Sequence, residues 1–356
     1  MSPVAHGTTF FNTVFYVSVL PFICFPLVFA GDVTANTATV KQMLLFLANA
    51  HIAVTLYFYW DRDFRGILTS NPRRYVWFPL AAVVGSGLSY AVLPVRLSDV
   101  WWMAFTFWQN WHFSKQNFGI YALISRDQTP DSRVSAFERR LLLGVSAAGA
   151  VGGLFLVVGD ASPLRSMALA LRGVAGYATL ALLATGAVYL VLSWQRFTLE
   201  RAAFFLFALL FFGPQFVTMN ADVGFTTYSL SHSLQYLFFM TVIAFNASPR
   251  PGAHEGRSET ALLSALVFFS CVLVGGAVLT IRGDFAQLLG PLGTSMPSLA
   301  RFVVGATFGL VVAHFIVDAH AWRLRDTPQR EFVLDRFHFI GRSPMLAVSV
   351  RDGDAA

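Results

Sequence analysis

The feature that most constrains this chain is a series of apolar runs, each about as long as a bilayer is thick. A helix needs about 20 predominantly apolar residues to cross the hydrocarbon core of a membrane. Such runs recur along the 356 residues, of which 56% are hydrophobic and 12% are charged. A soluble protein of ordinary composition carries about 25% charged residues. The chain is therefore predicted to be an all-α, polytopic integral membrane protein, a bundle of about ten transmembrane helices.

The predicted spans follow one another with only short loops between them. They are residues 8–30, 40–60, 75–94, 100–125, 140–159, 173–194, 202–219, 227–246, 260–281 and 297–322. Residues 1–325 are predicted to form one transmembrane domain, and residues 326–356 a cytoplasmic tail. Both cysteines, Cys24 and Cys271, fall inside apolar runs, so we expect small buried side chains rather than a disulfide.

The positive charges predict the orientation of the bundle. Eighteen of the 25 Lys and Arg residues lie in the loops on one side and in the C-terminal tail. Loops rich in Lys and Arg stay in the cytoplasm. We therefore predict that both termini are cytoplasmic and that the protein lies in the cell's inner membrane as a multi-pass protein. Because the net charge of +6 sits in short loops, no nucleic-acid partner is expected.

Four histidines interrupt the apolar runs and are the candidate metal ligands. His51, His112, His232 and His314 lie in the second, fourth, eighth and tenth predicted spans. These even-numbered helices all run in the same direction across the membrane. Ionisable groups inside a membrane usually face the protein interior and have a function. Since neutral imidazole is the commonest protein ligand for zinc, copper and iron, we predict that the four rings meet around a metal ion.

Each of these histidines has polar residues three or four positions later, on its own helix face. The polar neighbours are Thr55 after His51, Lys115 and Gln116 after His112, Gln235 and Tyr236 after His232, and Asp318 after His314. Asp318, Tyr236, Gln116 and Gln235 are predicted to surround and orient the ligands. Asp318, Tyr236 and Lys115 are the candidate catalytic residues. Lys115 has two open roles, a structural ion pair with Asp318 or binding of a polar substrate group.

Three short segments around these histidines resemble the Brp/Blh family of membrane β-carotene 15,15'-dioxygenases. They are HFSKQNF at 112–118, SHSLQY at 231–236 and AHFIVD at 313–318, and a fourth segment begins at Ala50. The chain departs from the family pattern at Thr55 and Asn117, where Asp is expected, and at Tyr236, where a second histidine is expected. Ala50 and Ala313 stand where the pattern has Pro. The resemblance implies iron (Fe²⁺) held by histidines, O₂ as co-substrate, and a carotenoid- or isoprenoid-like substrate taken from the bilayer.

The sequence leaves other metals and other functions open. Zinc, copper or haem fit the same histidines, and a haem-binding electron carrier is one alternative. A transporter or a proton or ion relay is another, because intramembrane His, Lys and Asp also carry ions. Broken helices and inverted repeats are typical of transporters, and the sequence shows little of either. The clustered histidine boxes of membrane desaturases are absent from the sequence, and the oligomeric state is left open.

Overall fold

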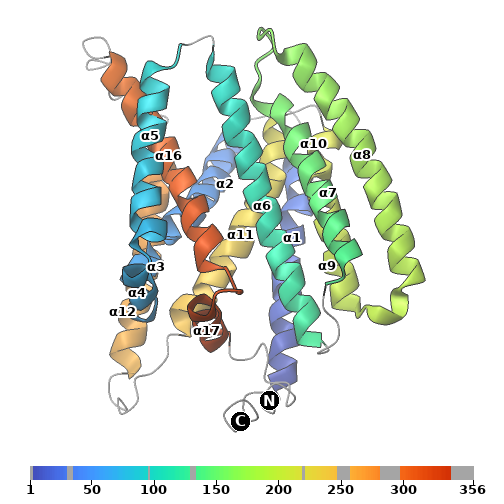
Figure 1. The fold of residues 1–356 in the computed structure, drawn as a ribbon, viewed down its shortest axis with the longest axis vertical. Coiled ribbons are helices and arrows are strands. Elements are labelled where there is room, and N and C mark those ends of the chain that lie inside the picture. The colour runs from blue at the N-terminus through green and yellow to red at the C-terminus, as the bar shows by residue number, and fades with distance from the viewer. Residues whose placement is uncertain are drawn as a thin grey trace. The chain divides into compact units, whose positions relative to one another are not determined.

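The computed structural model describes residues 3–29, 35–94, 97–128, 134–218, 221–246, 257–280 and 297–337. These residues are helical almost throughout and form no strand, so the predicted all-helical fold is confirmed for them. Figure 1 shows the helices as a ribbon. In chain order they are α1 (Pro3–Phe29), α2 (Ala35–Val54), α3 (Tyr57–Trp60), α4 (Arg62–Ser70), α5 (Phe78–Val92), α6 (Ser98–Gln128), α7 (Ala136–Gly152), α8 (Arg165–Leu192), α9 (Leu199–Leu210), α10 (Gly213–Val217), α11 (Ala221–Phe245), α12 (Arg257–Ser270), α13 (Gly276–Thr280), α16 (Pro297–Ala321) and α17 (Thr327–Arg336).

Among the described residues, five helical segments are long and apolar enough to cross a membrane, as expected for an integral membrane protein. They are Arg73–Val92, Ala136–Val157, Arg165–Leu192, Leu262–Thr280 and Pro297–Ala321. The remaining predicted spans fall on α1, α2 with α3, α6, α9 with α10, and α11. α6 is 31 residues long, but the polar residues between positions 109 and 117 lower its hydropathy. That all ten segments cross the membrane stays a prediction.

Two of the predicted spans are interrupted helices. α2 ends at Val54 and α3 begins at Tyr57, and the N–H of Leu56 donates to the carbonyl of Ala53, three residues back, at 3.0 Å. α9 and α10 are separated at residues 211–212, just before the Gly–Pro pair at 213–214. A proline removes a backbone donor and favours such a break. The first interruption has no proline or glycine, and the sequence did not predict it.

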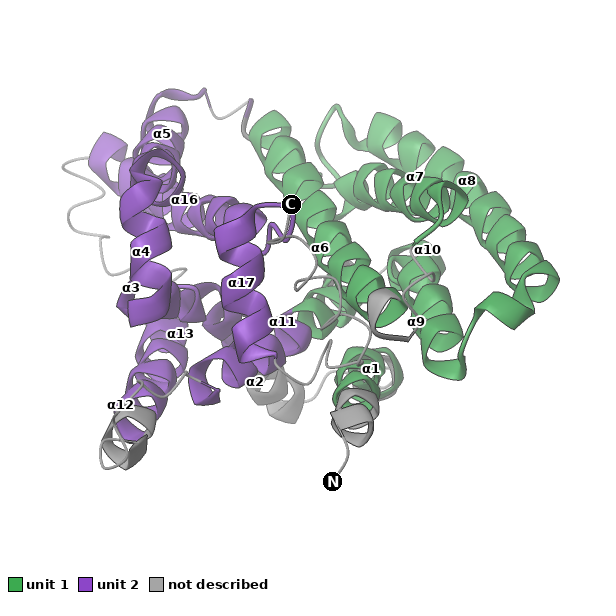
Figure 2. Cartoon of the chain, turned by 60° about the horizontal axis from the view of Figure 1, so that its bottom comes forward, with its two compact units in different colours: residues 1–32, 99–232, 339–356 green, residues 33–98, 233–338 purple. Residues whose placement is uncertain are grey.

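The chain divides into two compact units, coloured green and purple in Figure 2. Unit 1 contains residues 1–32, 99–232 and 339–356, and unit 2 contains residues 33–98 and 233–338. The boundary at 232/233 falls inside α11, which therefore contributes to both units. The predicted start of the tail at residue 326 lies between α16 and α17, and α17 belongs to unit 2.

Unit 1 contains a buried ion pair that connects four helices. Arg201 on α9 donates to both carboxylate oxygens of Glu138 on α7, each at 2.9 Å. Tyr121 on α6 and Tyr189 on α8 donate to the same carboxylate, each at 3.0 Å. Ser135 completes a capping box with Glu138 at the start of α7. Buried charges are tolerated when they are paired and fully hydrogen-bonded in this way.

Unit 2 is held together by close contacts at glycines. α5 and α16 lie side by side (Figure 1), and their backbones approach at Gly305 and Gly309. A Cβ on Gly309 would lie 2.5 Å from the Cα of Val83, and one on Gly305 would lie 2.6 Å from the carbonyl oxygen of Ser86. Small residues allow such approach between helices in membranes. The contact matters for function because α16 carries His314.

α17 is fixed to unit 2 by a buried arginine. Arg336 donates to both carboxylate oxygens of Asp61, at 3.2 and 3.0 Å, and to Asp63 at 2.5 Å. Asn246 at the end of α11 donates to the carbonyl of Arg336 at 2.9 Å. Burial raises the pKa of the Asp61 carboxyl, and the Arg336 guanidinium acts in the opposite direction. Arg336 therefore favours the charged form of the carboxylate that also caps the N-terminus of α4.

We expect Gly309→Ala to lower the free energy of unfolding by about 1–3 kcal/mol, the usual cost of overpacking. The added methyl group would meet backbone atoms of α5, which cannot rotate away as a side chain can. Gly85→Ala is the matched control, because a Cβ at Gly85 meets no atom within 4 Å. Thermal unfolding of both variants in detergent, followed by circular dichroism, measures the difference. Equal midpoints would show that α5 and α16 do not pack this closely.

Removing Arg201, the ion-pair partner of the buried Glu138 carboxylate, should lower the free energy of unfolding more than Gly309→Ala does. Arg201→Ala is expected to cost about 3–5 kcal/mol, because it leaves a buried charge uncompensated. Arg139→Ala, at an exposed position on α7, is the control. The midpoint of thermal unfolding should fall strongly for the first variant and little for the second. A small effect of both would contradict the role given to the ion pair.

Candidate metal centre

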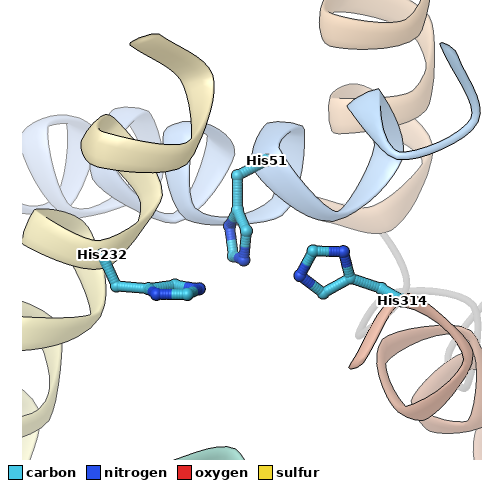
Figure 3. Close-up of side chains that lie close together, drawn as sticks. All are labelled: His51, His232 and His314. Atoms are coloured by element: carbon cyan, nitrogen blue, oxygen red, sulfur yellow. The ribbon is translucent and has the colours of Figure 1, made fainter. Parts of the chain in front are cut away.

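Two buried histidines face each other in unit 2. His51 lies in the last turn of α2 and His314 on α16, and each residue is 3% exposed. Their ring centroids are 5.0 Å apart, with the ring planes at 78°. A nitrogen of one ring lies within 4.8 Å of a nitrogen of the other. Figure 3 shows both rings, together with the ring of His232 on α11.

A buried carboxylate lies beside this pair. Asp318 follows His314 by one turn of α16, and its Oδ2 is 3.6 Å from Nε2 of His314. Two atoms that each bind one ion at about 2.1 Å lie about 3.0–3.4 Å apart at tetrahedral or octahedral angles. A small adjustment would therefore let both atoms bind the same ion. Unit 2 alone thus offers two imidazoles and one carboxylate.

A chain of short hydrogen bonds connects Asp318 to His314 through two hydroxyl groups. Tyr236 donates to Oδ1 of Asp318 at 2.6 Å, and its oxygen lies 2.9 Å from the hydroxyl of Thr55. The Thr55 hydroxyl lies 2.6 Å from Nδ1 of His314. The other ring has a similar neighbour, because the hydroxyl of Ser233 lies 2.8 Å from Nδ1 of His51. In both histidines Nδ1 is therefore in contact with a hydroxyl group from another segment of the chain.

The interruption of α2 places Thr55 in this chain. Thr55 is the first residue after α2 and lies in the turn that leads to α3. α2 itself is held against the π-helical segment Cys271–Gly275 by another close contact, since a Cβ on Gly275 would lie 2.5 Å from the Cβ of Ala53. The backbone around Thr55 is thus fixed by packing on one side, and its hydroxyl contacts Tyr236 and His314 on the other.

The remaining two candidate ligands form a second pair, within unit 1. The ring centroids of His112 on α6 and His232 on α11 are 5.1 Å apart, and both side chains are buried. Phe113 lies against the His232 ring, with centroids 4.2 Å apart, and Gln116 donates to the His232 carbonyl at 3.0 Å. His232 is followed directly by Ser233, which contacts His51 in unit 2. That both pairs bind one ion stays a prediction.

Two other predicted site residues differ in their surroundings. Lys115 is exposed on α6, and its ammonium group lies over the ring of Trp111, 4.7 Å from the centroid. Gln235 is fully buried on α11. The catalytic role of Lys115 and the orienting role of Gln235 stay predictions.

The i+4 neighbours of the histidines contact other helices as well as their own. Asp318 lies beside His314 of the same helix, as its spacing predicts. Thr55, however, contacts His314 rather than serving only as a neighbour of His51, and Gln116 contacts the backbone of His232. The reason is geometric: side chains on the buried face of a helix reach the helix packed against that face. Sequence reasoning therefore found Thr55 and Gln116 but could not assign their partners, and it gave no role to Ser233.

No known protein family, curated protein or solved structure matches this chain. A nitrogen of His51 lies within 4.8 Å of a nitrogen of His314, and Oδ2 of Asp318 lies 3.6 Å from Nε2 of His314. Imidazole and carboxylate donors suit a divalent transition metal. The hydroxyl groups on the Nδ1 atoms and on Asp318 supply the outer contacts that metal ligands ordinarily have.

Proposed function

We propose that this protein is a membrane-embedded metalloenzyme, with a non-haem iron ion held in unit 2 by His51, His314 and Asp318. The observation that carries the proposal is the buried His314 ring, which has a nitrogen of His51 within 4.8 Å and the Asp318 carboxylate 3.6 Å from its Nε2. A two-histidine, one-carboxylate set with open positions is typical of non-haem Fe²⁺ oxygenases. Iron bound there would supply O₂ activation, a chemistry that side chains alone do not provide.

The residues around the donor set have defined tasks in this proposal. Tyr236 holds Asp318 in position through its hydrogen bond to Oδ1, so that Oδ2 is directed toward His314. The apolar helices exclude bulk water and favour a substrate that dissolves in the bilayer. Together with the resemblance to the Brp/Blh family, this supports an oxygenase that acts on a carotenoid- or isoprenoid-like molecule. His112 and His232 are further proposed ligands, with Gln116 and Gln235 as their orienting neighbours.

The membrane topology is part of the same proposal. Within the part of the chain that the structure describes, five helices have the length and composition to cross a bilayer. We propose that the other five predicted spans do so as well, with both termini in the cytoplasm and the protein in the inner membrane. The proposed ligands would then lie inside the bilayer, where a lipid-soluble substrate reaches them directly.

Metal analysis tests the donor set. Purified wild-type protein is expected to contain about one iron per chain, and His51→Ala, His314→Ala and Asp318→Ala should each retain at least about tenfold less. His320→Ala is the matched control, because His320 lies on the same helix and outside the donor set. Plasma mass spectrometry measures iron, zinc and copper together. Wild-type protein without bound metal, or full metal content in both His51→Ala and His314→Ala, would contradict the proposal.

The same measurement of bound metal shows whether residues of unit 1 are metal ligands. If His112 and His232 bind the same ion, His112→Ala and His232→Ala should also lose metal. If both variants keep it, the ligands are confined to unit 2. Oxygen consumption in the presence of β-carotene, lost in His314→Ala, then tests the oxygenase activity itself.

The interrupted helices favour a transporter as the second candidate function. Broken helices at Thr55–Leu56 and at residues 211–212 are typical of ion sites in transporters. In that case, proteoliposomes with wild-type protein should show proton or ion flux that metal chelators do not change. Asp318→Asn should abolish the flux, because it removes the one intramembrane carboxylate beside the histidines. Flux in the absence of bound metal would favour the transporter over the oxygenase.

A further inference from the structure

Serine and threonine hydroxyls in the helices of this protein commonly bond to their own backbone. In seven described residues the hydroxyl donates to the carbonyl four residues back, at 2.6–3.0 Å, as is usual for these residue types inside a helix. The residues are Ser114, Ser146, Thr179, Thr185, Thr227, Thr241 and Thr280. Thr55 and Ser233 differ because their hydroxyls contact Nδ1 of a buried histidine in another segment.

We propose that Thr55 and Ser233 are positioning residues that fix the tautomers of His314 and His51. In this arrangement each ring carries its proton on Nδ1 and donates it to the hydroxyl, so that Nε2 is the nitrogen that binds metal. The inference rests on the proposed metal site in unit 2. It adds two residues that touch neither metal nor substrate and that act through the ligands.

The direction of the hydrogen bonds at His314 follows from counting hydrogens. An ionised Asp318, as a ligand of a cation would be, can only accept, so Tyr236 donates its single hydroxyl hydrogen to Oδ1. The Tyr236 oxygen must then accept from Thr55, whose only hydrogen is used in that bond. The Thr55 oxygen can therefore only accept from His314, which requires a proton on Nδ1. The lone pair of His314 then lies on Nε2, the atom 3.6 Å from Asp318.

At His51 the Ser233 hydroxyl has the corresponding position, and the ring also forms a hydrogen bond with the backbone of Ala48. The Ser233 hydroxyl lies 2.8 Å from Nδ1 and can accept the ring proton. Ser233 lies on α11 one turn before Tyr236, so a single helix face supplies a hydroxyl to His51 and the link between Thr55 and Asp318. A metal-binding histidine ordinarily donates its second N–H to such an outer partner, and loss of the partner typically lowers metal affinity about 10–100-fold.

Copper binding to full-length protein in detergent tests the proposal. Thr55→Val keeps the side-chain shape and removes the hydroxyl, and Ser233→Ala removes the other. Each is expected to weaken Cu²⁺ binding about 10–100-fold, and Thr55→Ser should restore it. Thr241→Val is the matched control, because that hydroxyl only bonds to its own helix backbone in unit 2. Isothermal titration of metal-free protein with Cu²⁺ measures the affinities.

Pulsed electron paramagnetic resonance measures a signal that a general packing defect would not change. The quadrupole signal of the imidazole nitrogen that does not bind Cu²⁺ reports the hydrogen bond at that atom. Thr55→Val should change this signal for one histidine. Tyr236→Phe should change it too, because Thr55, with no acceptor at Tyr236, can turn its hydrogen toward His314. This second variant decides the matter if Thr55→Val does not fold.

Failure of the inference and failure of the proposed function give different results. If wild-type protein binds Cu²⁺ tightly and neither affinity nor signal changes in Thr55→Val and Ser233→Ala, the positioning role is overturned. The proposed metal site is then unaffected. Wild-type protein that binds no Cu²⁺ and contains no metal overturns both. Equal losses in Thr55→Val and Thr241→Val would also overturn the positioning role, because they would show a general effect on stability.

Discussion

A charged or polar group buried among apolar helices must be paired, and this requirement organises unit 2. Asp318 lies in the interior with the Tyr236 hydroxyl on one oxygen and the His314 ring beside the other. An isolated carboxylate in such surroundings would cost several kcal/mol. Each side chain in the group satisfies its neighbour, and the group therefore forms one connected network rather than several separate contacts. A divalent cation between His314 and Asp318 would complete it.

The network needs four segments that are far apart in the sequence to meet closely. α2, the turn at Thr55, α11 and α16 supply its members. Their approach depends on positions without side chains, such as Gly309 on α16 and Gly275 beside α2. A methyl group at either position would separate the helices by a fraction of an ångström or more. Hydrogen bonds of 2.6–2.9 Å do not tolerate such a shift, so packing and the site are linked.

Unit 1 shows the same principle with a different outcome. Its buried carboxylate, Glu138, is matched by Arg201 and two tyrosines, and the network is complete without a further ion. Asp318 instead has a tyrosine hydroxyl and a histidine ring beside it. The two buried carboxylates therefore have different surroundings, a guanidinium at Glu138 and an imidazole at Asp318.

The sequence by itself determined the helical, membrane-type fold and the candidate residues. Apolar runs of bilayer length predict helices, and the spacing of three and four residues places Asp318 beside His314, because both depend on local geometry. Only the tertiary structure decided that Thr55 contacts His314, that Ser233 contacts His51, and that the four histidines form one pair within each unit. Those contacts join residues about 180–260 positions apart. They depend on which helix faces pack together, which the period of a single helix does not specify.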